Sequence, residues 1–361
     1  TFPIVTLIMA FTALFGIGGV PLFSMARGAG KKEQAEKILG NSFGLLTISA
    51  VILTVVSYLF CRPILFLFGA SEASYGYAQS YLKIYLIGTL FSMLTTGLNG
   101  YINAQGFPRI GMLTTVLGAV ANIILDPIFI FVLDMGVAGA ALATVIGQMI
   151  SAVWVVQFLV GKKAVIRLKK SCIKLDRKIT KNIFLLGTSN FIMQGTNCAV
   201  QIVCNSTLQI YGGDVYVGIM TVLNSIREIF MLPLNGIANG GQPVISFNYG
   251  AKKYARVRKT YLLALGAASA LSLIAFACFQ IFPRQIISIF GNGSDLYFKF
   301  SERYFRIYMF LTIVNGIQPV TSNFFNSIGK SQLGVFMSLT RQIIFLLPLI
   351  IIFPIFMGID G

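Results

Sequence analysis

Residues 38–60 read ILGNSFGLLTISAVILTVVSYLF, a run of apolar and small polar residues without one charged side chain. Two further apolar stretches, Leu113 to Leu133 and Leu262 to Phe282, are of similar length. Each reaches the roughly 20 residues that a helix needs to cross ~30 Å of hydrocarbon. The runs lack the alternation of apolar and polar residues that is typical of a membrane barrel. The sequence therefore predicts an all-α polytopic membrane protein.

The composition supports this prediction and limits the alternatives. Hydrophobic residues make up 56% of the chain, charged residues only 11%, and the net charge is +17. The Lys and Arg residues fall into short segments between the apolar runs, which indicates membrane orientation rather than nucleic-acid binding. His is absent and the five cysteines are scattered, so neither a metal site nor a disulfide framework is predicted. We expect no cofactor beyond a coupling ion and no obligate protein partner.

Apolar runs bounded by turn and charge signals predict about ten spans. They lie near residues 1–26, 38–60, 78–104, 110–133, 138–160, 181–209, 214–249, 258–282, 299–328 and 332–357. Basic segments follow the first, third, fifth, seventh and ninth of these, so all five lie on one side of the membrane. The positive-inside rule makes that side the cytoplasmic face of the cell (inner) membrane.

An internal repeat runs along nearly the whole chain. Pro21, Ser24 and Gly28 recur 222 residues later as Pro243, Ser246 and Gly250. The match continues to its end, where the segment 135–139 (MGVAG) recurs as 357–361 (MGIDG). Such a constant register predicts two copies of one structural unit.

The repeat predicts how the spans are organised. Corresponding spans are six apart, so the two halves should have the same orientation and be related by an axis along the membrane normal. We expect two six-helix lobes in the intact protein, with the first and last spans missing from this chain. The predicted division is an N-terminal lobe at 1–160, a cytoplasmic linker at 161–180 and a C-terminal lobe at 181–361.

Three segments carry a resemblance to a known family. They are residues 121–129 (ANIILDPIF), 136–144 (GVAGAALAT) and 242–252 (QPVISFNYGAK). In order and spacing they resemble the MATE (multidrug and toxic compound extrusion) family of bacterial transporters. The resemblance implies two lobes around a central cavity and drug efflux driven by inward flow of protons or sodium ions. The acids that some members carry in the second lobe have no match here, so we expect no cation site there.

Asp126 is the leading candidate for ion coupling. An ionisable group deep in an apolar span is costly unless it is paired, hydrated or protonated, and such residues are functional by default. Asn122 and Asp126 share a helix face, and the following span places Thr144 and Gln148 on one face. Asn99 and Asn103 share a face of the preceding span. Three helices could therefore contribute oxygen ligands around one carboxylate.

The repeat and the resemblance both strengthen this candidate. Position 126 corresponds to Pro348 in the second copy and Asn122 to Ile344, so the acid is specific to one lobe. The family resemblance implies Asn122, Asp126 and Thr144 as a coupling site. The alternative is that Asp126 caps a helical segment that starts at Pro127.

Two further charged positions lie inside predicted spans. Glu228 follows Arg227, and since adjacent helical residues point in different directions they are not expected to pair with each other. Glu228 would then bind another helix or lie at a cavity wall. Arg341 is expected to extend to lipid headgroups near the cytoplasmic end of its span rather than to bind substrate.

The sequence favours a secondary antiporter that exports drugs or other small organic, often cationic, compounds in exchange for protons or sodium. The alternative is a flippase or exporter of lipid-linked precursors or polysaccharide, for which more basic residues inside the cavity would be expected. An enzyme is not predicted, because no catalytic constellation is present.

Overall fold

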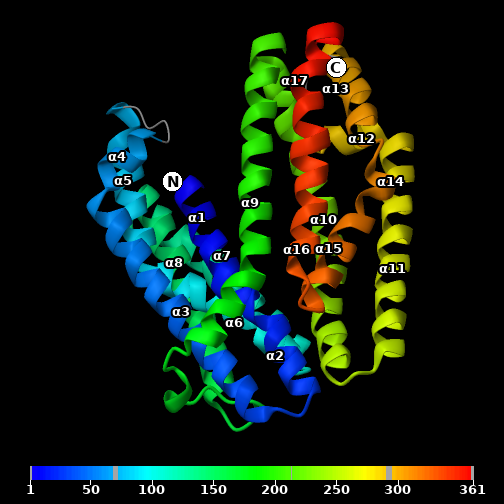
Figure 1. Cartoon of the computed structure of the whole chain (residues 1–361). Helices are drawn as coiled ribbons and strands as arrows, with labels where there is room; N and C mark the ends of the chain where they lie inside the picture. Colours follow the sequence, from blue (N-terminus) through cyan, green and yellow to red (C-terminus); the bar gives the residue numbers. More distant parts are fainter. Residues whose placement is uncertain (1, 68–71, 213, 290–294, 359–361) are drawn as a thin grey trace. The chain divides into compact units, whose positions relative to one another are not determined.

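The computed structural model describes residues 2–67, 72–212, 214–289 and 295–358. All regular structure in these residues is helical, as predicted. The chain forms two compact units (Figure 1). Unit 1 holds residues 1–191 and 250–252, and unit 2 holds residues 192–249 and 253–361.

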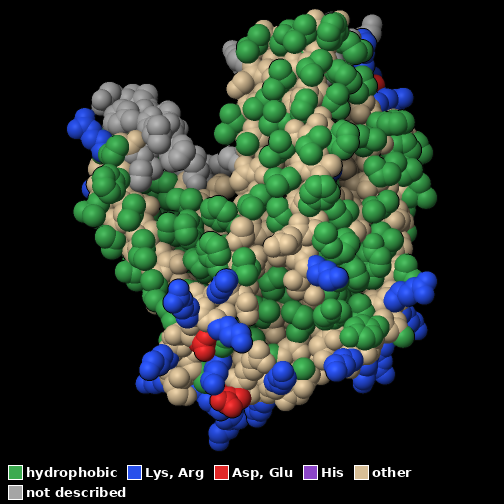
Figure 2. All heavy atoms as spheres, viewed as in Figure 1, with side chains coloured by type: hydrophobic (Ala, Val, Ile, Leu, Met, Phe, Trp, Pro, Cys, Tyr) green, Lys and Arg blue, Asp and Glu red, His purple; other side chains and the backbone are tan. Residues whose placement is uncertain are grey.

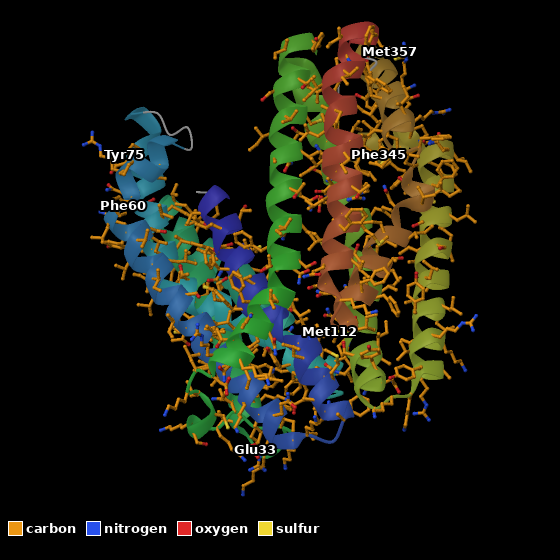
Figure 3. The ribbon with its side chains drawn as sticks, viewed as in Figure 1. Glu33, Phe60, Tyr75, Met112, Phe345 and Met357 are labelled. Atoms are coloured by element: carbon orange, nitrogen blue, oxygen red, sulfur yellow. The ribbon has the colours of Figure 1, made fainter. Side chains whose placement is uncertain are left out.

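Unit 1 is a bundle of long helices with short breaks, and it also contains the start of α9. In chain order the elements are α1 Phe2–Thr12, η1 Ala13–Ile17, α2 Gly19–Gly28, α3 Lys32–Leu59, α4 Cys61–Leu67, α5 Glu72–Ile87, α6 Thr89–Ala104, α7 Pro108–Pro127, η2 Ile128–Val132, α8 Gly136–Val160, η3 Lys170–Cys172 and α9 Arg177–Gly212. Figure 3 shows Glu33 at one end of α3 and Phe60 beyond the other, so this helix begins among charged residues and ends among apolar ones.

Unit 2 repeats this arrangement with the second half of the chain. Its elements are α10 Asp214–Gly250, α11 Tyr254–Ile281, α12 Pro283–Ser288, α13 Asp295–Tyr308, α14 Thr312–Asn315, α15 Ile317–Ser327, α16 Ser331–Leu339, η4 Thr340–Leu346 and α17 Leu347–Met357, together with the rest of α9. Phe345 and Met357 mark the last long helical segment in Figure 3.

Six helical stretches in the described residues are long and apolar enough to cross a membrane. They are Ile4–Gly28, Lys32–Leu59, Pro108–Val132, Gly136–Val160, Tyr254–Ile281 and Ser331–Met357. The pair Gln79–Ile87 and Thr89–Ala104, bent by 53°, makes a seventh if it is counted as one span. The fold class is confirmed, whereas the number of ten spans stays a prediction. Large apolar side chains remain exposed along these helices, as a lipid-facing surface requires (Figure 2).

The internal repeat is visible in the helix bounds. α3 and α11 both have 28 residues, and both ends are displaced by 222 positions. The tight turns recur as well. Gly106 and its counterpart Gly329 both have positive φ, at 92° and 79°, which glycine adopts without steric cost. At the turn before α3, Gly30 has φ 74°, and its counterpart before α11 is Lys252 with φ 57°. The two copies therefore share backbone conformation even where the residue differs.

The core of unit 1 is fixed by a buried tyrosine. Tyr101 of α6 is fully buried, and its hydroxyl lies 2.5 Å from Oγ of Ser42 on α3 and 3.3 Å from the carbonyl of Gly16 in η1. A Cβ at Gly16 would lie 2.4 Å from Cα of Gly97, so these two backbones can approach only through glycine. The hydrogen bonds and the close approach together hold η1 and α3 against α6.

The segment predicted as a linker, 161–180, packs against unit 1. Apolar Ala164, Ile166 and Leu168 are buried and alternate with exposed Val165, Arg167 and Lys169, as in an extended chain with one face covered. Lys169 forms an ion pair of 2.7 Å with Glu36 of α3. Lys and Arg side chains gather at this end of unit 1 (Figure 2). The segment is therefore held in place by its apolar residues while its basic residues face outward.

Candidate functional site

Asp126 lies within a continuous helix rather than at a helix start. α7 runs through Pro127 and continues as the π-helical turn η2. Pro127 has helical φ and ψ of −61° and −37°, and no side chain caps η2. The interpretation of Asp126 as an N-cap is therefore wrong. Proline inside a helix removes one backbone hydrogen bond, and π-helical turns are frequent at functional sites.

Two glycines bring α7 and α8 into close contact next to Asp126. A Cβ at Gly147 of α8 would lie 2.8 Å from the carbonyl oxygen of Gly118 on α7. A Cβ at Gly118 would lie 2.4 Å from Oγ of Ser151, one turn beyond Gly147. Asn122 of α7 is the next side chain along this contact, since its Cβ is 3.6 Å from the same Gly147 position. The glycine contact thus sets the distance between the polar groups of the two helices.

Three of the predicted residues come together at this contact. Nδ2 of Asn122 lies 3.2 Å from Oδ1 of Asp126 and 3.4 Å from Oγ1 of Thr144 on α8. The Thr144 hydroxyl in turn donates to the Ala140 carbonyl at 2.9 Å. All three side chains are half-buried. The cluster therefore combines one carboxylate with an amide and a hydroxyl inside apolar helices.

A fourth residue, Tyr81 of α5, belongs to this cluster and was not predicted. Its hydroxyl lies within interaction range of the Thr144 hydroxyl and of the Asp126 carboxylate. The ring stacks on Tyr85 at a centroid distance of 5.9 Å and an interplanar angle of 13°. Tyr81 stood out in the sequence only as a repeated residue, with counterpart Tyr304, and nothing in the pattern linked it to Asp126.

Asn99 and Asn103 lie elsewhere, which corrects their predicted grouping with Asp126. Nδ2 of Asn99 donates to the Gly111 carbonyl at 3.1 Å, and Asn103 also lies against Gly111. Gly111 is about 22 Å along α7 from Asp126, at 1.5 Å per residue. These two side chains therefore join α6 to the start of α7 and cannot share an ion with Asp126.

Gln148 is half-buried, one turn beyond Thr144 and close to the bend between α5 and α6. Its Oε1 atom has no hydrogen-bond partner among the described residues and lies next to Gly88, which separates α5 from α6. Its backbone carbonyl accepts a hydrogen bond from Thr95 at 3.3 Å. Gln148 thus borders the cluster without a contact to the carboxylate.

Glu228 lies in unit 2 and pairs with its neighbour. Oε1 of Glu228 is 3.1 Å from Nη2 of Arg227, and both side chains are partly exposed. The expectation that these adjacent residues would not pair is wrong, because the long arginine side chain can fold back along the helix. Glu228 is therefore not part of the Asp126 cluster.

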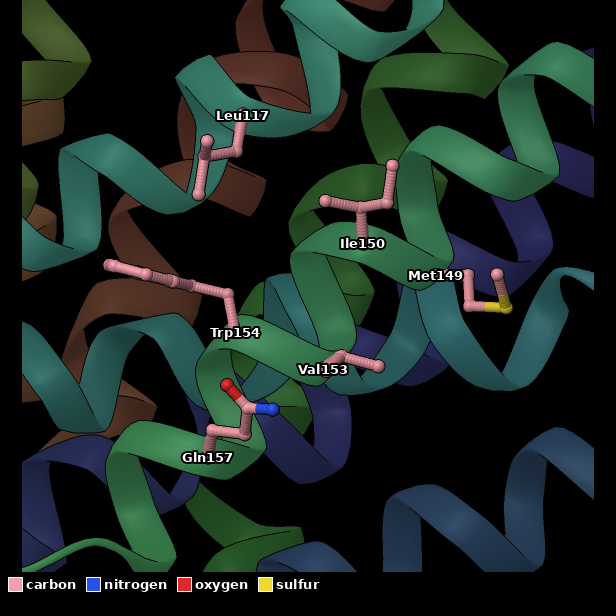
Figure 4. A pocket seen from close by; sticks show the side chains of 6 residues that line it. All are labelled: Leu117, Met149, Ile150, Val153, Trp154 and Gln157. Carbon is pink, nitrogen blue, oxygen red and sulfur yellow. The ribbon is translucent and has the colours of Figure 1, made fainter.

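A shallow apolar groove of about 270 Å³ lies on α7 and α8 (Figure 4). It is lined by Leu117, Met149, Ile150, Val153, Trp154 and Gln157. Met149, Ile150 and Val153 are among the exposed apolar residues, as on a surface that faces lipid. No charged side chain lines the groove.

The ligand set at Asp126 suits a proton or a hard monovalent cation. Hard cations prefer oxygen ligands, and the carboxylate, amide and hydroxyl groups supply them. Within the described residues there is no group of three His, Cys, Asp or Glu side chains that could hold a metal ion. The chemistry of the cluster is therefore that of one titratable carboxylate with neutral oxygen neighbours.

Comparison with known proteins places the chain among transporters. The family model MatE matches residues 1–128 and 189–352. The multidrug export protein MepA of Staphylococcus saprophyticus is 25% identical over 365 residues, which cover 100% of this chain and 79% of that protein. MepA of Staphylococcus aureus is also 25% identical, over 367 residues with the same coverage.

Solved structures of transporters are also similar to this chain. A crystal structure of MATE in the bent conformation has a TM-score of 0.93 at 25% identity and covers 100% of this chain and 80% of that one. A MOP superfamily transporter from Pyrococcus furiosus has a TM-score of 0.92 at 24% identity, with 98% and 79% covered. This second likeness shows the fold alone. With its matched family model and its helical membrane fold, the chain belongs to the MATE family of membrane transporters.

Proposed function

We propose that this protein is a secondary active antiporter that exports drugs or other small organic, often cationic, compounds in exchange for protons or sodium ions. The likeness to the MepA multidrug export proteins along the whole chain supports the export of small molecules. The observation that carries the coupling proposal is the Asn122–Asp126–Thr144 cluster, a carboxylate within a membrane helix with neutral oxygen ligands from a second helix.

The cluster couples ion binding to helix packing. An unpaired carboxylate inside a membrane is costly, and binding of a proton or sodium ion neutralises it. Asn122 and Thr144 lie on different helices, so a cation that recruits their oxygens draws α7 and α8 together. Release of the cation leaves a charge that favours a more hydrated arrangement. The helix pair α7 and α8 would thus have two states, one with the cation bound and one without it, and alternating access requires such a two-state element.

Orientation follows from charge. We place the basic segments that follow the first, third, fifth, seventh and ninth predicted spans on the cytoplasmic side of the cell (inner) membrane. Export then moves substrate away from that side while the coupling ion moves toward it.

The test uses the full-length protein in vesicles loaded with a fluorescent cationic dye, with proton and sodium gradients imposed separately. Gradient-driven dye movement that is lost in Asp126→Asn supports the proposal and identifies the ion. Asp134→Asn is the matched control, because Asp134 lies in the exposed turn after η2 with φ 51°, a conformation that Asn adopts readily. Coupled transport that persists in a folded Asp126→Asn variant would contradict the proposal that Asp126 couples ion binding to transport. No movement with any dye or gradient would instead favour the flippase or exporter of lipid-linked precursors or polysaccharide.

A further inference from the structure

Unit 2 contains a cluster of charged side chains on helical segments that the Asp126 site does not use. Arg227 and Glu228 lie on α10 and form the 3.1 Å ion pair described above. Arg341 lies in the π-helical turn η4, close enough to Arg227 for the two positive charges to repel each other. The structure gives Arg341 no ion pair with any described acid. The two guanidinium groups have one described carboxylate in an ion pair, that of Glu228, which leaves an excess of positive charge.

Arg341 lies within a long apolar helical stretch. Ser331–Met357 is one of the apolar stretches long enough to span a membrane, and Arg341 is about 15 Å along its axis from Ser331. That depth is well inside the span, and Arg341 lies beside another arginine. Since an uncompensated charge at such depth is costly, this arrangement needs a ligand or hydration to be stable.

Two other helices, α13 and α9, form hydrogen bonds with the segments that carry the arginines. Tyr308 of α13 donates to Oδ1 of Asn224 on α10 at 2.7 Å, and this tyrosine lies within range of the Arg227 charge. Gln342, next to Arg341, is only 2% exposed and binds Asn197 of α9 at 2.5 Å. These hydrogen bonds fix the backbone on both sides of the two guanidinium groups.

Some buried polar atoms of this cluster have no hydrogen-bond partner among the described residues. Nε of Arg227 is buried without a hydrogen-bond acceptor among the described residues, and so is the hydroxyl of Thr340, which precedes Arg341. A buried donor without an acceptor is unfavourable, and native structures seldom leave one unless something else binds there. Nε of Arg227 can only donate, so the partner that it lacks is an acceptor, while Oε1 of Gln342, itself an acceptor, also has no partner among the described residues.

The repeat separates these charges from the shared architecture. At the 222-residue offset, Arg227, Glu228 and Arg341 correspond to Val5, Thr6 and Ala119. Tyr308, by contrast, has its counterpart in Tyr85 beside the Asp126 cluster, at an offset of 223 residues. Both units therefore have a tyrosine at this position. Near it, unit 1 has an acidic side chain, whereas unit 2 has more arginine than acidic side chains.

We infer that Arg227 and Arg341 form a binding site for an anionic group, a carboxylate or phosphate, of the transported molecule. A guanidinium group can bind a carboxylate or a phosphate through two parallel hydrogen bonds, a bidentate geometry that few other side chains offer. This inference rests on the proposed transport function and narrows its substrate class to amphipathic molecules that carry an acidic group, alone or beside a cation. A phospholipid headgroup offers the same chemistry and is distinguished in the test.

The experiment compares one xanthene dye as its free carboxylic acid and as its methyl ester, which keep the same cationic ring. Binding to the full-length protein is measured in nanodiscs of neutral lipid. We expect the acid to bind about tenfold more tightly than the ester, the strength of one or two hydrogen bonds to a charged group. Arg341→Gln should remove this preference, and Arg341→Lys should keep part of it. Arg256→Gln, an exposed position at the start of α11, is the control.

Thermal unfolding of each variant shows whether it is folded, and Arg227→Gln supplies a second test if Arg341→Gln is not. An equal affinity for acid and ester in the wild type, or an unchanged preference in both folded variants, would overturn the inference. Loss of the preference only in discs that contain anionic phospholipid supports the anion site and assigns it to lipid. Ester transport that needs Asp126 without any preference for the acid leaves the proposed function intact and removes this inference alone.

Discussion

Nδ2 of Asn122 lies 3.2 Å from Oδ1 of Asp126, one helical turn further along α7. The amide contacts both the carboxylate and the Thr144 hydroxyl of α8. Among the described residues it is therefore the group that transmits a change of charge at Asp126 to the second helix.

Replacement of Asn122 should uncouple the ion from transport. We expect Asn122→Leu, which preserves volume and removes the amide, to lower gradient-driven dye transport by roughly tenfold, within the 1–3 kcal/mol that coupling free energies usually span. Dye binding without a gradient should change little. Asn103→Leu is the matched control, because Asn103 is exposed on α6 and lies against Gly111, far along α7 from Asp126. Equal effects of the two substitutions would show that Asn122 has no special role.

The contact of α7 with α8 offers a test that does not touch a polar group. Gly147→Ala places a methyl group 2.8 Å from the Gly118 carbonyl, so the helices must separate. We expect a loss of about 1–3 kcal/mol in stability, as for other overpacked sites, together with weaker ion coupling. The measurement is thermal unfolding in detergent with and without the coupling ion.

Gly266→Ala serves as its control. A Cβ at Gly266 of α11 meets nothing within 4 Å, so this substitution should be neutral or stabilise the helix by up to about 1 kcal/mol. A Gly147→Ala variant as stable as Gly266→Ala would mean that α7 and α8 are not held at the observed separation.

The docked segment 161–180 makes a prediction about pH. The hydrogen bond to Glu36 raises the pKa of the Lys169 ammonium above its usual value of 10.5. Because the pKa is higher in the folded protein than in the unfolded one, the pair stabilises the fold fully below about pH 10.5. Its contribution is lost as the pH rises through the raised pKa.

We therefore expect Lys169→Met to lower the unfolding temperature at neutral pH and to differ less from the wild type above about pH 11. Lys170→Met, an exposed neighbour, is the control. A difference between Lys169→Met and the wild type that persists unchanged at high pH would show that the ion pair is not what the substitution removes.

Much of the fold could be predicted because its determinants are local. The length of apolar runs reports membrane-crossing helices, and the 222-residue register appears again in the equal lengths of α3 and α11. The pair of Asn122 and Asp126 followed from helical spacing alone. Thr144 followed from the family resemblance, since no local pattern joins two helices.

The rest depends on long-range packing, which spacing does not reveal. Asn99 and Asn103 share a helix face as expected, but their helix meets α7 at Gly111 rather than at Asp126. Arg227 pairs with the adjacent Glu228 because a long flexible side chain can overcome the difference in helical direction. Charge in the second unit was judged by the count of basic residues, whereas the meeting of Arg227 with Arg341 depends on how two helices pack.

Tyr81 provides the last test, since only the structure places it at the ion site. Its hydroxyl lies within interaction range of both Thr144 and Asp126, so α5 is the third helix at the cluster. Tyr81→Phe keeps the ring and its stacking on Tyr85, and removes only the hydroxyl. We expect stability within about 1 kcal/mol of the wild type, the usual contribution of one hydrogen bond.

The same variant should change the ion concentration, or the pH, at which transport is half-maximal. Tyr254→Phe, at a tyrosine that is 59% exposed, is the control for loss of a hydroxyl. A shifted ion dependence at unchanged stability would place Tyr81 in the coupling machinery. An unshifted dependence would restrict the functional cluster to α7 and α8 and leave the hydroxyl of Tyr81 as a packing contact of α5.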